Sequence, residues 1–139
     1  MDYETVEAGV FGAGLRGLGL NIVVGDVRTT AAFLETVFGM GIHRLSADFA
    51  IVTYGDTVFQ LHSDGTYASN PLLALLPENP PRGCGIELRL YDSDPEVAAA
   101  RAEAAGGTIL QPPTDKPHGL REAYILDPDG YVWVPSRPL

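Results

Sequence analysis

The chain has 139 residues, a formal net charge of −9 and a sequence pI of about 4.5. This acidity argues against nucleic acids and anionic membranes as partners, because their phosphate groups would repel the protein. The length fits one domain or a fused pair of small units, and the 45% of hydrophobic residues suffice for a core.

The sequence gives two indications of compartment. Cys84 is the one cysteine, so no intrachain disulfide can form, and such sparse cysteine usage fits a reducing environment. The acidic residues 1–4 are not followed by an apolar run of signal-peptide type, and no stretch approaches the roughly 20 apolar residues of a membrane span. We therefore expect a soluble cytoplasmic protein.

The first part of the chain predicts a leader and then a unit of order βαβββ. Residues 1–16 contain three glycines and little periodicity, so we expect an extended or mobile leader. Over residues 17–63 we predict a strand at 18–24, an N-cap at Asp26, a helix through 31–38, a short strand at 42–45 and a hairpin of 49–54 with 57–61. A linker follows at 64–83, and its apolar residues 72–76 predict one or two helical turns ended by Pro77.

Residues 84–139 repeat the order. We predict a strand at 85–91, an N-cap at Asp94, a helix over 97–105, a short strand at 108–110 and a loop at 111–120. A closing hairpin joins 123–126 to 131–134 through Asp127-Pro128-Asp129-Gly130, in which both aspartates can accept hydrogen bonds from nearby backbone N–H groups. Gly19 and Gly85 lie 66 residues apart, as do Asp26 and Asp92, which indicates an internal duplication.

This ordered set resembles the vicinal-oxygen-chelate superfamily of glyoxalases, extradiol dioxygenases and bleomycin-resistance-type binding proteins. The resemblance covers roughly residues 18–138 and is carried by 21–26 leading into 33–39, by 57–61, by Lys116-Pro117-His118-Gly119-Leu120-Arg121 and by Asp127-Pro128-Asp129-Gly130. It implies an α+β fold in which two βαβββ units form curved mixed sheets around a groove. It also implies a homodimer.

Metal-dependent members of that family carry His, Glu or sometimes Gln at four positions, on the first and last strands of each unit. The matching positions here hold Gly19, Gln60, Gly85 and Val134, of which only Gln60 has a side-chain ligand atom. A shift of two residues would offer Asn21, His62 and Glu87 instead. We expect no metal and no other cofactor.

Seven residues are candidates for ligand binding in the groove: Asn21, Gln60, His62, Glu87, Arg89, His118 and Arg121. Each has a structural alternative: a solvent-exposed His62, an ion pair of Glu87 with Arg89, mutual pairing of Asn21 with Gln60, or an ordinary surface loop around His118. We expect the aromatic residues of the strands to be mostly core, with Phe59 and Trp133 facing the helices.

The hypothesis that these observations favour is a metal-free protein that sequesters a small ligand, cationic or aromatic, in its groove. The alternative is a metal-dependent lyase or dioxygenase that uses the shifted set. A third possibility is a structural role, which a groove sealed by side chains would support.

Overall fold

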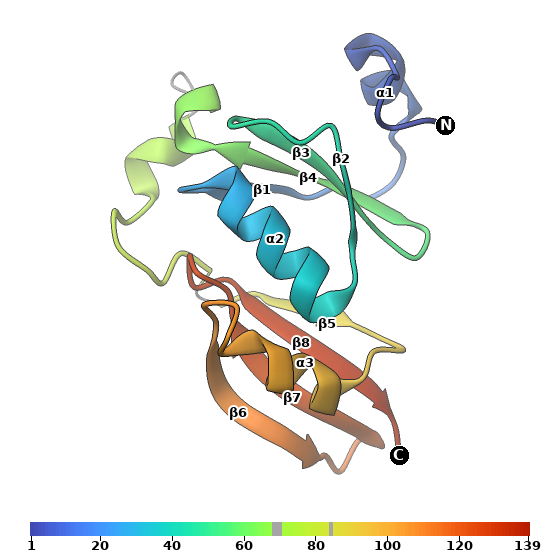
Figure 1. Ribbon diagram of the computed structural model, residues 1–139, viewed down its shortest axis with the longest axis vertical. Helices are drawn as coiled ribbons and strands as arrows, with labels where there is room; N and C mark the ends of the chain where they lie inside the picture. The colour runs from blue at the N-terminus through green and yellow to red at the C-terminus, as the bar shows by residue number, and fades with distance from the viewer. Residues whose placement is uncertain (68–70, 84) are drawn as a thin grey trace.

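The computed structural model describes residues 1–67, 71–83 and 85–139, so Cys84 lies outside the described residues. Its fold is α+β, as predicted, with two four-stranded mixed sheets that each follow the βαβββ order (Figure 1). The first sheet has the order β1-β4-β3-β2 and the second β5-β8-β7-β6. In both sheets the first and last strands of a unit pair in parallel, as Asn21 does with Gln60.

The first unit contains β1 (Asn21–Val24), α2 (Val27–Phe38), β2 (Gly41–His43), β3 (Phe49–Tyr54) and β4 (Thr57–Ser63). Asp26 caps α2 as predicted, because its carboxylate accepts the backbone N–H of Thr29 at 2.9 Å. Gly39 ends the helix in the left-handed conformation. The predicted turns near Pro77 are present as the 3₁₀ helix η2 (Pro71–Leu75), which follows η1 (Asp64–Tyr67).

The second unit contains β5 (Glu87–Leu90), α3 (Pro95–Ala102), β6 (Thr108–Asp115), β7 (Leu120–Leu126) and β8 (Val132–Pro138). The prediction of a loop throughout 111–120 was wrong, because Gln111–Asp115 continue β6. Pro112 and Pro113 fit there because β6 is an edge strand, and its register with β7 shifts on both sides of Gln111.

Before β1 the chain forms α1 (Ala8–Gly14), within the segment for which we expected an extended or mobile leader. The mobility of that segment stays a prediction. In the described part of the chain, no helix combines the length and the hydrophobicity needed to cross a lipid bilayer.

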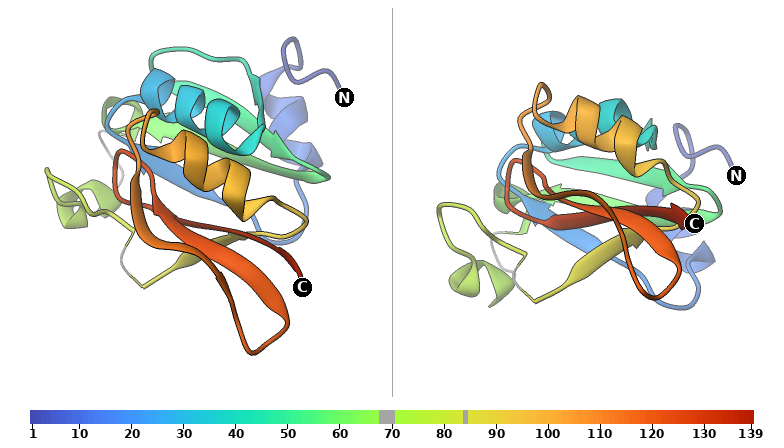
Figure 2. Two further views of the ribbon diagram at one scale, coloured as in Figure 1. Left: turned by 60° about the horizontal axis from the view of Figure 1, so that its bottom comes forward. Right: turned by 90° about the horizontal axis from the view of Figure 1, so that it is seen from below.

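One core lies between the two helices and the two sheets. Figure 2 shows α2 and α3 side by side on the same side of both sheets. Phe59 and Trp133 are buried against them, as predicted, with ring centroids 6.0 Å apart. Alternate residues of each strand therefore point to the opposite side, which we call the far face of each sheet. Tyr54 also packs against the core, whereas Phe49 and Tyr124 lie on far faces, so most of the strand aromatics are core as expected and these two are the exceptions.

Hydrogen bonds between distant segments fix the two units against each other. The hydroxyl of Tyr131 donates to the carbonyl of Val23 at 2.7 Å, and the backbone N–H of Gly25 donates to the carboxylate of Asp129 at 3.3 Å. Asp129 therefore bonds a residue of the first unit rather than its own turn, contrary to the prediction. Because both bonds join the start of the first unit to the last hairpin, the two far faces are held in one fixed arrangement.

Candidate functional site

The structure divides the seven candidate residues into two groups and leaves one apart. Asn21, Gln60 and His62 lie on the first sheet. Glu87, Arg89 and His118 gather at the far face of the second sheet, where Arg89 and His118 contact one glutamate and Glu87 pairs with Arg89. Arg121 points elsewhere, because its guanidinium group bonds Glu96 of α3 and Asp115 of β6.

On the first sheet, three polar side chains lie in a row on neighbouring strands. Oε1 of Gln60 accepts a 3.2 Å hydrogen bond from Nε2–H of His62. His62 is buried and its ring centroid lies 5.1 Å from that of Phe49, so it is not the exposed strand-end residue of the alternative interpretation. Burial lowers the pKa of His62, so its imidazole is neutral at pH 7.

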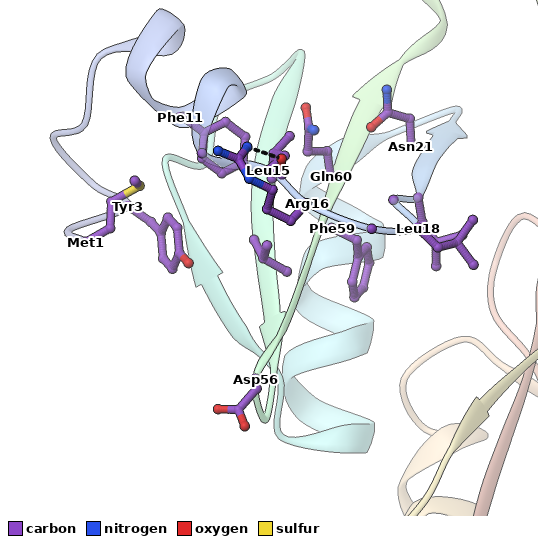
Figure 3. A pocket seen from close by; sticks show the side chains of 15 residues that line it. Met1, Tyr3, Phe11, Leu15, Arg16, Leu18, Asn21, Asp56, Phe59 and Gln60 are labelled. Carbon is purple, nitrogen blue, oxygen red and sulfur yellow. Dashed lines mark hydrogen bonds between the residues drawn. The ribbon is translucent and has the colours of Figure 1, made fainter.

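A groove of about 860 Å³ runs between this sheet and the N-terminal residues (Figure 3). Tyr3, Phe11 and Leu15 line it from the N-terminal segment. Asn21 and Gln60 line it from β1 and β4 and supply amide groups that can both donate and accept hydrogen bonds. A second cavity of about 380 Å³ lies directly between α1 and the sheet, where Phe11 and Leu15 face Phe49, Ile51 and Gln60.

The second sheet presents charge instead of apolar surface. Its centre is Glu122 of β7, a carboxylate only 1% exposed to solvent. Glu122 accepts a hydrogen bond from the guanidinium group of Arg89 and one from the hydroxyl of Tyr124 at 3.4 Å, and its Oε2 lies 3.3 Å from Nε2 of His118. Arg89 also bonds Glu87 at 3.3 Å. The ion pair proposed as an alternative for Glu87 and Arg89 is therefore present.

The electrostatics of this cluster follow from its neighbours. Burial alone would raise the pKa of Glu122, but the hydrogen bonds and charges of Arg89 and His118 outweigh it and leave that pKa below its ordinary value. A hydrogen bond with Glu87 raises the pKa of the Tyr124 hydroxyl. At neutral pH the cluster therefore holds an ionised Glu122 beside a protonated Tyr124.

A tight turn presents His118 to this cluster. The backbone N–H of Lys116 bonds the carbonyl of Leu120 at 2.8 Å, and Gly119 has a φ of 89°, which a residue with a side chain rarely adopts. Sequence reasoning selected His118 but missed Glu122 and Tyr124. The alternation of the strand was the available signal, because Ala123 and Ile125 occupy the core side and so place Glu122 and Tyr124 on the far face.

The side chains at the four matched positions do not fit the metal centre that metal-dependent members of the superfamily use. Of the four matched positions, Gly19, Gly85 and Val134 offer no side-chain ligand atom, and Gln60 is bonded to His62. Within residues 1–67, 71–83 and 85–139, no three His, Cys, Asp or Glu side chains come together as a metal site requires. In the shifted set, His62 is bonded to Gln60 and Glu87 to Arg89, and Asn21 offers a neutral amide.

Comparison with known proteins gives the family. A chain from Burkholderia phytofirmans PsJN, described as a glyoxalase/bleomycin resistance protein/dioxygenase family enzyme, superposes with a TM-score of 0.71, at 24% identity over 86% of this chain and 96% of its own. A glyoxalase-related enzyme from Fulvimarina pelagi gives 0.72, at 21% identity over 88% of each chain. An integron cassette protein from the mobile metagenome of V. cholerae gives 0.62, at 26% identity over 88% of this chain and 95% of its own.

The search of curated proteins found no match. The family model described as Glyoxalase/Bleomycin resistance protein/Dioxygenase superfamily matches residues 18–134, which include the first sheet and all of the second except the end of β8. The chain therefore belongs to the glyoxalase/bleomycin resistance protein/dioxygenase superfamily.

Proposed function

We propose that this protein binds a small, largely aromatic molecule in the groove of the first sheet, without a metal ion. One observation carries the proposal: the groove has about 860 Å³ and a mixed lining that combines aromatic Tyr3 and Phe11 with the amide groups of Asn21 and Gln60. Small-molecule sites commonly have 300–1,000 Å³ and a mainly apolar lining with a few polar groups that orient the ligand. An open groove of this size also argues against a purely structural role.

The sequence and the groove give weaker evidence about the charge of the ligand. The net charge of −9 favours cations over anions in general. The charged side chains that line the groove, however, are one Asp56 and one Arg16, which oppose each other in sign. We therefore place aromatic character before positive charge in the proposal.

The remaining expectations about partners stay predictions. They are a homodimer, a cytoplasmic location, and the absence of nucleic-acid and membrane partners. Exposed Leu18, Leu75 and Ile86 are consistent with a further contact surface. Sedimentation analysis of the purified protein would test the dimer.

Filling the groove tests the proposal. Val58 lines the groove from β4, and we expect Val58→Trp to weaken binding of the neutral fluorescent probe N-phenyl-1-naphthylamine by at least tenfold, because the indole would occupy the ligand space. Fluorescence titration measures the affinity, and acridine orange serves as the cationic comparison. Thr57→Trp is the matched control, since Thr57 is exposed on the same strand. Equal binding by both variants, or no binding of either dye by the unaltered protein, would remove the proposal.

A further inference from the structure

The helix that covers the groove is weak by its own sequence. α1 has seven residues, of which Gly9, Gly12 and Gly14 are glycines. Each glycine costs a helix about 1 kcal/mol relative to alanine, and isolated helices shorter than about 12 residues are marginal in water. Glu7 precedes the helix, and glutamate is not among the preferred N-cap residues. Contacts with the rest of the protein must therefore hold α1 in place.

In the described part of the chain, hydrogen bonds and ring contacts tie this segment to the end of β2. The ring of Tyr3 lies 5.5 Å from that of His43 and packs edge-on against Phe11 at 6.0 Å. The next residue, Arg44, donates its backbone N–H to the carboxylate of Glu4 at 3.1 Å and its guanidinium group to the carbonyl of Val6. Arg44 has a φ of 51°, a left-handed conformation that costs a non-glycine residue about 1–2 kcal/mol.

The helix also leaves space beneath it. Phe11 is the buried residue of α1, at 7% exposure, yet the cavity of about 380 Å³ separates α1 from β3 and β4. That space is half open to solvent and is lined mainly by apolar side chains. A short helix held at one side, above an apolar space of ligand size, has the geometry of a cover.

From these three observations we infer that residues 1–16 form a lid, which opens to admit the ligand and closes over it with Tyr3 and Phe11. Phe11 lines both the groove and the cavity beneath α1, so the closed lid contacts a molecule in either space. This inference rests on the proposed function, because it assigns the entrance and two contact residues of the same site. Neither aromatic residue belongs to the motifs that carry the family resemblance.

Trypsin cleavage after Arg16 tests the lid without knowledge of the ligand. Arg16 is exposed, and its guanidinium donates to the carbonyls of Ala13, at the end of α1, and of Leu15, both at 2.7 Å, so these bonds must break before the side chain can enter the specificity pocket of trypsin. We expect Phe11→Ala to accelerate the release of residues 1–16 by about tenfold, measured by mass spectrometry. Val10→Ala is the control on the same helix, because Val10 is 54% exposed, and it should change the rate less than twofold.

Equal cleavage rates for the two variants would overturn the lid. A fall in the thermal midpoint of Phe11→Ala as large as that of Phe33→Ala in the core would also overturn it, because α1 would then be part of the global fold.

The probe provides the second readout, since bound N-phenyl-1-naphthylamine should slow cleavage after Arg16 in the unaltered protein. Probe binding with an unchanged rate would overturn the lid and leave the proposed function standing. Failure of the probe to bind would remove the proposed function, and the comparison of variants would still decide whether residues 1–16 open.

Discussion

Replacing Asp127 with alanine is expected to lower the free energy of unfolding by about 4 kcal/mol. The Asp127 carboxylate accepts three hydrogen bonds: from the backbone N–H groups of Asp129 and Tyr131 at 3.0 Å, and from Nε1 of Trp133 at 2.9 Å. Asp127 is 4% exposed and Trp133 is 2% exposed, so water cannot replace the carboxylate. Each buried donor left without a partner costs about 1–3 kcal/mol.

Urea denaturation of both proteins gives the difference directly. Asp56→Ala is the matched control, because Asp56 occupies the turn of the corresponding hairpin in the first unit and is exposed. Its cost should stay within about 0.5 kcal/mol, as for ordinary surface substitutions. If the two variants lost equal stability, Asp127 would be an ordinary turn residue and the buried bond from Trp133 would contribute little.

The same residue predicts a dependence of stability on pH. Burial is the main reason why the pKa of Asp127 rises from 3.8 to about 6, so the folded protein holds this proton more tightly than the unfolded chain does. Its contribution is complete below the unfolded pKa and is lost as the pH rises through about 6, which amounts to about 2 kcal/mol between pH 4 and pH 7. Asp127→Asn, which cannot titrate, should remove this part of the pH profile. An unchanged profile in that variant would contradict the assignment.

Asp127 also shows why much of the fold could be predicted. Its turn depends on residues within six positions of each other, and so do the N-caps at Asp26 and Asp94. The duplication then repeats these local signals, so the βαβββ order could be predicted from the spacing alone. The extent of β6 could not, because its prolines are tolerated only through its place at the edge of a sheet that forms between distant segments.

The candidate site was less predictable for the same physical reason. His118 and Arg121 belong to one motif, but their side chains point in different directions. His118 contacts Glu122, whereas Arg121 bonds Glu96 of α3. Residues 1–16 carry no strong helix signal, and the contacts of Tyr3 with His43 and of Glu4 with Arg44 join this segment to residues 40 positions away. Contacts of this kind depend on tertiary structure, which no local pattern contains.

Replacing Arg89 with methionine is the second substitution for which we expect a large effect, a loss of about 3 kcal/mol at pH 7. The variant keeps most of the apolar volume but leaves Glu122 buried and without its strong cationic partner. Removal of one partner of a buried ion pair costs about 3–5 kcal/mol, because the other charge is stranded away from water. Arg121→Met is the matched control: its partners Glu96 and Asp115 are 45% and 63% exposed, so it should cost less than about 1 kcal/mol.

The pH dependence and a double variant separate the stranded charge from lost packing. Because the pKa of Glu122 is below its ordinary value in the unaltered protein, its contribution is present above the unfolded pKa and is lost as the pH falls through the folded value. Without Arg89 that pKa should rise, so the cost of Arg89→Met should shrink toward pH 4, where Glu122 accepts a proton. The double variant Arg89→Met, Glu122→Leu should recover most of the stability, since no charge then stays buried. If Arg89→Met cost no more than Arg121→Met, or if its cost were independent of pH, the cluster on the second sheet would be a set of surface contacts and Glu122 would not be its electrostatic centre.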